Sequence, residues 1–131
     1  GNPPAPLSKV ASGGELARVM LALRLVLTQA PPTLVFDEVD AGIGGSAAVA
    51  VGNALCEVAQ QHQVFVVTHL AQVAARANVQ IGISKSVRKN VTFANATVLS
   101  RDERVDEIAR MLSGGEAKAS ARATAAEMLG N

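Results

Sequence analysis

The amino-acid sequence predicts an α/β fold in which a mostly parallel sheet is flanked by helices. Two short apolar runs, residues 33–36 and 64–67, are typical of strands inside such a sheet because neither alternates with polar residues. A stretch rich in alanine and valine, from about Ser46 to Gln60, separates them and is long enough for a helix. A strand, a helix and a second strand joined by short links form a parallel unit. We therefore expect both strands to be buried on their two faces.

Length and composition indicate one globular domain over residues 1–131, with enough chain to bury a sizeable core. The single cysteine, Cys56, excludes an internal disulfide and lies in an apolar helical pattern, so we expect a buried thiol. The net charge of +1 gives no overall attraction to nucleic acid, and the lack of Trp and Tyr disfavours base stacking. No signal peptide and no membrane-spanning run is recognisable, so we expect a cytoplasmic protein.

The first predicted helix covers about residues 16–27, where leucines recur at helical spacing. Ser12 is a candidate N-cap residue, and Glu15 stands three positions later, as a capping box requires. Between them, Gly13 and Gly14 leave backbone N–H groups bare at a helix N-terminus, which favours anions. A capped helix after a turn would explain the same residues without a ligand.

Polar residues follow both predicted strands. Asp37 and Glu38 come directly after the first, and Thr68 and His69 close the second. Ligands of α/β sheets gather outside the carboxyl ends of the strands, so we expect Asp37, Glu38 and His69 along one edge. In nucleotide hydrolases a first carboxylate at such an edge can hold Mg²⁺, and a second can orient or deprotonate a water molecule. Acids that cap the next helix or face water, and a structural histidine, remain alternatives.

The remaining elements follow in order along the chain. A glycine-rich loop over residues 40–46 leads into the helix described above. After the second strand, the sequence predicts a helix over about 70–76, strands over 79–84 and 91–99, and helices over 104–112 and 117–129. A basic turn over residues 85–90 joins the last two strands. Its charges could contact DNA phosphates, although the charged tip of a hairpin is usually just solvated. They come from Lys85, Arg88 and Lys89.

Taken in order, these features resemble the C-terminal half of an ABC-type ATPase head. Three strings are more specific and are similar to the RecN family of SMC-like bacterial DNA-repair ATPases: LSKVASGGEL at 7–16, FDEVDAGIGG at 36–45 and EIARMLSG at 107–114. The resemblance covers nearly the whole chain. It implies the C-terminal lobe of an ABC/SMC-type head, which binds and hydrolyses ATP between two engaged heads and acts in DNA double-strand break repair and recombination.

The resemblance also implies a role for each acid and for the histidine at the predicted sheet edge. Asp37 matches the Walker B residue that holds Mg²⁺, and Glu38 matches the catalytic base. His69 matches the switch histidine. ATP and Mg²⁺ are the implied ligands.

Two further segments match family motifs that act near the nucleotide. The signature contacts the γ-phosphate of ATP bound to the opposing head, so it would act in trans; its residues are Ser12, Gly13, Gly14 and Glu15. The D-loop matches Ala41, Gly42, Ile43 and Gly44. Two positions depart from the pattern, because Ala11 replaces the leading Leu of the signature and Gly44 replaces the usual Asp of the D-loop.

A second signature-like string, residues 112–116, matches the bare motif better than residues 11–15 do. No apolar strand ending in two acids follows it, and a helix C-terminus followed by a new helix would explain its two glycines. We therefore assign the signature to the first copy and expect the second to end a helix.

No P-loop pattern, Gly-x-x-x-x-Gly-Lys-[Ser/Thr], occurs in these residues. The resemblance places that loop in an N-terminal Walker A half, so the segment alone is predicted to be inactive. Its implied partners are that half, a second head in a homodimer, and DNA through the full-length protein, in a nucleoid-associated setting. Two alternatives stay open: a non-catalytic docking module, and the head segment of another SMC-type chromosome protein.

Overall fold

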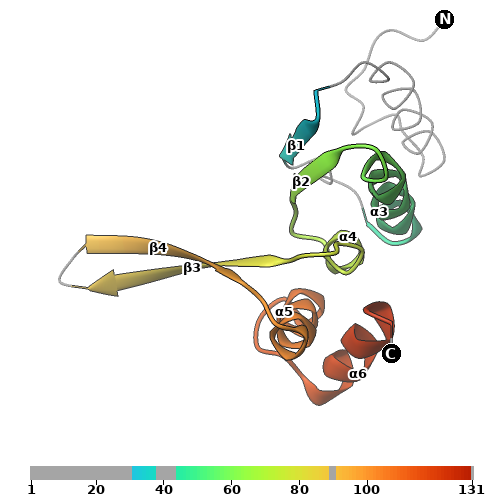
Figure 1. Ribbon diagram of the computed structural model, residues 1–131. Helices are drawn as coiled ribbons and strands as arrows, with labels where there is room; N and C mark the ends of the chain where they lie inside the picture. Colours follow the sequence, from blue (N-terminus) through green and yellow to red (C-terminus); the bar gives the residue numbers. More distant parts are fainter. Residues whose placement is uncertain (1–30, 38–43, 89–90, 131) are drawn as a thin grey trace, which may run out of the picture. The chain divides into compact units, whose positions relative to one another are not determined.

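The computed structural model describes residues 31–37, 44–88 and 91–130 (Figure 1). The chain divides into two units, Gly1–Arg76 and Ala77–Asn131. The helix predicted over residues 16–27 lies outside the described residues.

The first unit contains the predicted strand, helix and strand. Strand β1 (Thr33–Asp37) pairs in parallel with β2 (Gln63–Val67), and helix α3 (Ser46–Val58) lies between them in the chain. Helix α4 (Ala71–Ala74) follows β2 and is shorter than the predicted helix over 70–76. The α/β class and the parallel pairing are therefore confirmed.

The core of this unit lies between one face of the parallel pair and the two helices. Val51 and Leu55 of α3 form a buried cluster with Val73 of α4. Phe36 of β1 and Val66 of β2, which are partly buried, pack against this cluster. Gly52 permits the close approach of α4, because an added Cβ would lie 3.3 Å from the carbonyl oxygen of Gln72. Cys56 is only half-buried, and its Sγ donates to the carbonyl oxygen of Arg76 at 3.6 Å.

The prediction that β1 and β2 are buried on both faces is wrong for the described structure. Burial alternates along each strand, so only one face meets the helices. Val35 is 71% exposed and Val67 is 56% exposed on the other face. The physical reason is that a crossover helix covers the single face across which it returns, and no described element covers the second.

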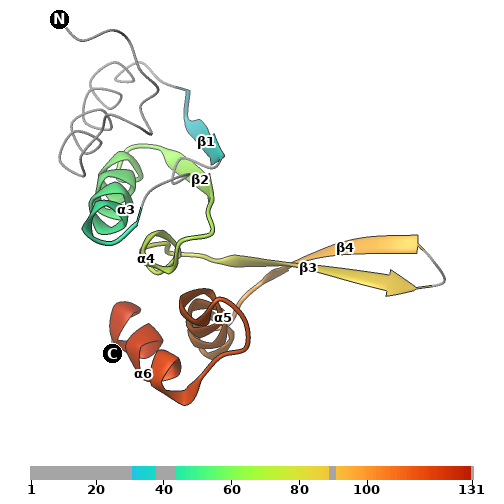
Figure 2. The same ribbon diagram turned by 180° about the vertical axis from the view of Figure 1, so that it is seen from behind.

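The second unit begins with an antiparallel ribbon formed by β3 (Ile81–Arg88) and β4 (Val91–Val98) (Figures 1 and 2). The strands differ from the prediction, because residues 85–88 extend β3 instead of forming a basic turn. Only residues 89 and 90 separate the two strands, and they lie outside the described residues. Alternating residues such as Ile83, Lys85 and Val87 fit a strand. The charge cluster was therefore misread as a turn.

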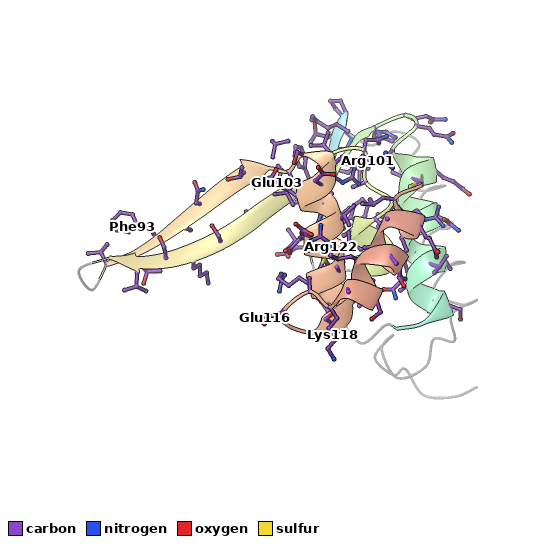
Figure 3. All side chains as sticks on the ribbon, turned by 90° about the horizontal axis from the view of Figure 1, so that it is seen from below. Phe93, Arg101, Glu103, Glu116, Lys118 and Arg122 are labelled. Atoms are coloured by element: carbon purple, nitrogen blue, oxygen red, sulfur yellow. The ribbon has the colours of Figure 1, made fainter. Side chains whose placement is uncertain are left out.

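Helices α5 (Arg101–Ser113) and α6 (Ala119–Met128) complete the second unit and pack against each other. Their contact buries Ile108, Ala109 and Ala125 completely. An ion pair between Arg122 and Asp106, with an N–O distance of 2.7 Å, ties the helices at the surface. Figure 3 shows Arg122 on α6 beside α5. The predicted bounds of both helices were close, although α5 begins three residues earlier than expected.

A capping box explains the earlier start of α5. The backbone N–H of Glu103 donates to Ser100 Oγ at 3.4 Å, and the backbone N–H of Ser100 donates to Glu103 Oε2 at 2.7 Å. The hydrogen bonds from Ser100 to the carboxylate lower the pKa of Glu103 below its ordinary value of 4.5. Sequence analysis missed this Ser-x-x-Glu pattern, although it is the signal that marks a helix start.

Candidate functional site

The parallel register brings Asp37 and the end of β2 to the same edge of the sheet. Asp37 is the last residue of β1 and lies opposite Val67, the last residue of β2. Thr68 and His69 follow immediately, so they lie just beyond the carboxyl end of the neighbouring strand. Asp37 and His69 are both exposed. The shared edge that the sequence predicted for Asp37 and His69 is therefore present.

Three contacts at the opposite end of the strands fix this register. The backbone N–H of Gln63 donates to the carbonyl oxygen of Pro32 at 2.8 Å. Thr33 Oγ1 donates to Gln63 Oε1 at 3.0 Å, and His62 Nδ1 lies 3.2 Å from the carbonyl oxygen of Pro31. A slip of one residue would turn every side chain of β1 to the other face. These contacts therefore help to decide which residue ends β1 beside Val67.

The contact of His62 with Pro31 was not predicted from the sequence. The sequence held one indirect signal, because His62 directly precedes β2 and Pro31 stands two residues before β1. In a parallel pair the two strand starts lie side by side, so a polar side chain at one can reach a carbonyl at the other.

Thr68 shapes the chain between β2 and α4. Its Oγ1 accepts a hydrogen bond from the backbone N–H of Leu70 at 3.0 Å, a local turn that Ser and Thr favour. Helix α4 begins at Ala71. His69 is the single residue enclosed by this turn, so its backbone position at the sheet edge is set by Thr68.

Asp37 offers the chemistry that a magnesium ion requires. Mg²⁺ prefers oxygen ligands and is commonly bound by one or two carboxylates together with substrate phosphates and water. Among the described residues there is no group of three or more potential metal-ligating side chains, so an all-protein metal cage is not found there. An exposed carboxylate at a sheet edge fits the phosphate-assisted mode.

Most other predicted site residues lie outside the described ranges. These are Glu38, the signature residues Ser12, Gly13, Gly14 and Glu15, and the D-loop residues Ala41, Gly42 and Ile43. Gly44, the last D-loop position, is described, and no described atom lies within 4 Å of a Cβ added there. Gly45 follows it with a φ of 58° and occupies the N-cap position of α3, without a side-chain cap hydrogen bond. The described surroundings of Gly44 would therefore admit a larger side chain.

The second signature-like string ends a helix, as expected. Helix α5 stops at Ser113, and Gly114 adopts the left-handed conformation with a φ of 67°. Backbone N–H groups of Gly114 and Gly115 both donate to the carbonyl oxygen of Arg110. Helix α6 begins only at Ala119, with Lys118 as its N-cap residue. The glycines therefore terminate a helix here and do not form a helix N-terminus.

Solved structures identify the class of protein to which this fold belongs. The chain superposes on an Smc head domain with coiled coil and joint from Pyrococcus yayanosii with a TM-score of 0.59 and 21% identity, over 80% of this chain and 19% of that one. A chain from a study of ATP-driven dimerization and DNA-stimulated activation of SMC ATPases gives 0.57 and 20%, over 79% of this chain and 62% of that one. The described α/β fold, with its parallel strands and flanking helices, is therefore shared with the heads of SMC proteins.

Sequence relatives identify the family. The chain is 56% identical to the DNA repair protein RecN of Deinococcus radiodurans over 87% of this chain, and 51% identical to that of Streptomyces coelicolor over 98% of it. No family model matches the sequence. The chain belongs to the RecN family. It spans 20% and 23% of the length of these two relatives, so it corresponds to a part of them.

No helix within the described ranges combines the length and the apolar character that a membrane crossing requires.

Proposed function

We propose that this segment is part of an SMC-like ATPase head that binds and hydrolyses ATP between two engaged heads, in a protein of DNA double-strand break repair and recombination. The observation that carries the proposal is the common carboxyl edge of β1 and β2, where Asp37 ends β1 and His69 follows the end of β2. Membership of the RecN family and the SMC-head fold support it.

Each residue at the edge has a chemical part in this proposal. The carboxylate of Asp37 would hold Mg²⁺, and the bound ion would supply positive charge next to the phosphate oxygens of ATP. Glu38, the next residue, accepts a proton from the attacking water. The imidazole of His69 can donate a hydrogen bond to a phosphate oxygen from the adjacent strand. These parts require a substrate phosphate close to the exposed end of β1.

The proposal includes partners outside these residues. An N-terminal Walker A half of the same protein supplies the P-loop, and a second head in a homodimer receives the signature in trans. DNA is engaged through the full-length protein, in the cytoplasm and associated with the nucleoid. The RecN relatives, which are four to five times as long as the matched part, leave room for such a half.

The first test concerns the base, in a full-length RecN-type protein that carries this segment. Glu38→Gln keeps the size of the side chain but cannot accept the proton, so ATP turnover should fall by about 10²–10⁴-fold while ATP binding persists. Steady-state hydrolysis and nucleotide binding measure the two effects. Asp37→Asn should instead weaken Mg²⁺ binding, so that half-maximal turnover needs a higher Mg²⁺ concentration, measured by titrating the ion.

Glu116→Gln is the matched control, because this exposed glutamate belongs to the second signature-like string and should leave turnover unchanged. Near-normal hydrolysis by Glu38→Gln would remove Glu38 from the chemistry and favour a non-catalytic docking module.

The second test asks whether the signature acts in trans. Ser12→Arg should block engagement of the opposite head sterically, so turnover should collapse while binding to the protein's own P-loop persists. If the signature acts in trans, each ATP site of a dimer combines the P-loop of one head with the signature of the other. In a mixed dimer of this variant and a variant disabled in its P-loop, one ATP site then carries both defects and the other carries none. Trans action predicts partial recovery of turnover in the mixture, measured on verified mixed dimers. If Ser12 acts within its own head, no recovery follows. If Ser12 only caps its own helix, the folded Ser12→Arg variant should hydrolyse ATP normally at low temperature.

A further inference from the structure

The alternation of exposure along β2 continues beyond the last residue of the strand. Val64 and Val66 are partly buried and pack against the core cluster of the first unit. The next residues continue the pattern, with Thr68 half-buried, His69 exposed and Leu70 half-buried. Thr68 is therefore a polar residue in a row whose other members are apolar. Valine has the same shape as threonine, so packing alone does not account for the hydroxyl group.

The hydroxyl group of Thr68 closes a local turn. Its Oγ1 accepts a hydrogen bond from the backbone N–H of Leu70 at 3.0 Å, and His69 is the residue enclosed by this bond. A closed turn restricts the backbone torsion angles of the enclosed residue. These angles decide where the Cβ atom of His69, and with it the imidazole, can lie.

Leu70 is a firm anchor for this turn. Its backbone carbonyl oxygen accepts hydrogen bonds from the N–H groups of Val73 and Ala74, at 3.1 and 3.0 Å, where α4 begins. Its side chain packs against the core cluster. Leu70 is therefore held by α4 and by the core, while Thr68 directly follows β2. The enclosed His69 is attached to the fold on both of its sides.

The position of this backbone bears on the part proposed for His69. An imidazole donates a useful hydrogen bond only over a short distance and at a nearly straight angle. The phosphate oxygen that it contacts must also lie close to Asp37, which ends the neighbouring strand. Misplacing a reacting or contacting group by about 1 Å can lower a rate by about 10²-fold. A contact that fixes His69 is therefore worth a large factor in turnover.

We propose that Thr68 is a positioning residue for ATP hydrolysis and that it acts through His69. Its hydroxyl group holds the backbone of His69 so that the imidazole is directed to the phosphates at the common edge of β1 and β2. This inference rests on the proposed function, because it takes His69 to contact bound ATP. It gives Thr68 itself no contact with ATP.

Steady-state ATP hydrolysis by a full-length RecN-type protein that carries this segment tests the proposal. Thr68→Val keeps the shape of the side chain but removes the acceptor. Its kcat should fall by about ten- to a hundredfold while the KM for ATP stays within about twofold, because the groups that hold the nucleotide are intact. Thr68→Ser restores the hydroxyl group and should recover most of the rate. Thr124→Val is the matched control, since it removes an exposed hydroxyl group that donates to the carbonyl oxygen of Ser120 within α6, and it should leave kcat unchanged.

A double-mutant cycle shows whether Thr68 acts through His69. His69→Ala should itself lower kcat, because the hydrogen bond to the phosphate is lost. In the His69→Ala background, Thr68→Val should change kcat by less than about twofold, since the side chain that it positions is absent. A residue that only stabilises the fold would lower kcat by the same factor in both backgrounds.

Hydrogen exchange in the same proteins reports on the turn without ATP. The amide of Leu70 should exchange at least about tenfold faster in Thr68→Val than in the unchanged protein, and Thr68→Ser should restore its protection. Peptides from α3 should exchange as before, which shows that the first unit is still folded. Thr68→Ala, which also lacks the acceptor, replaces Thr68→Val if valine disturbs folding.

Each contrary outcome overturns the proposal in a different way. Normal kcat in folded Thr68→Val, together with slow turnover by His69→Ala, removes Thr68 from the mechanism and leaves the proposed function standing. Equal slowing by Thr68→Val in both backgrounds assigns Thr68 to stability alone. Normal hydrolysis by His69→Ala removes His69 from the chemistry, which overturns this proposal together with the part that the proposed function gives to His69.

Discussion

The two strand pairs of this protein have similar residues but differ in burial. In β1 and β2 one face packs against α3 and α4, and the other is open. In β3 and β4 nearly every described residue is exposed, although one face of this strand pair is mostly apolar. Apolar character alone therefore does not decide whether a strand is buried.

The connection between the strands accounts for the difference. A parallel pair needs a long crossover, and here the crossover contains α3, whose apolar stripe covers the sheet. An antiparallel pair needs only a short turn, so β3 and β4 bring no helix of their own. Cover for a ribbon must come from a distant part of the chain or from another molecule.

The largest expected effect comes from a charged residue placed in the core between α3 and the covered face of β1 and β2. Val51 of α3 is 1% exposed, so Val51→Asp would bury a carboxylate without a partner. The local free energy of unfolding of the first unit should fall by about 3–5 kcal/mol. Hydrogen exchange of peptides from α3 and β2, measured in the full-length protein, should show this loss.

Asn53→Asp, at an exposed position of the same helix, adds the same charge and should change exchange little. Peptides from β3 and β4 should be unaffected by Val51→Asp. If these peptides lose protection to the same extent, the two units unfold together. The difference in burial between the strand pairs would then not correspond to a difference in local stability.

The sequence predicted the elements of the first unit well because each signal there was local. Apolar runs marked the strands, and the intervening length marked the helix. The shared edge of Asp37 and His69 followed from parallel pairing alone. The burial of the strands was predicted wrongly, because the number of covered faces depends on elements that a short apolar run does not encode.

The errors in the second unit have a different origin. Lys85 and Arg88 were read as turn residues because they are charged, whereas both positions belong to strand β3. The start of α5 was placed late because Ser100 was not recognised as a cap. The contact of His62 with Pro31 depends on the juxtaposition of two strand starts, which only the assembled sheet defines.

An intermediate effect is expected where α5 ends. Gly114 has a φ of 67°, and no described atom lies within 4 Å of an added Cβ, so Gly114→Ala would meet strain without a clash. The local stability of α5 and α6 should fall by about 1 kcal/mol, as for other residues forced into the left-handed region. Hydrogen exchange of α5 peptides measures this. Gly115→Ala, whose φ is not positive, should have little effect, and a large effect there would show that packing, not backbone conformation, matters at this end.

The smallest effect concerns the other end of α5, where the ribbon meets the helix. The pKa of Glu103 is lowered by its hydrogen bonds to Ser100, so the ionised carboxylate stabilises the folded state. A lowered pKa contributes stability above the unfolded value, near 4.5, and this contribution is lost as the pH falls through the folded value. Glu103→Gln should therefore destabilise the first turn of α5 near pH 7 and lose most of this effect well below pH 4.5. Comparing the opening of α5 amides in the two proteins across this range, with Glu116→Gln as a control, measures the difference. A difference that is the same at every pH would show that the charge of Glu103 does not contribute to the cap.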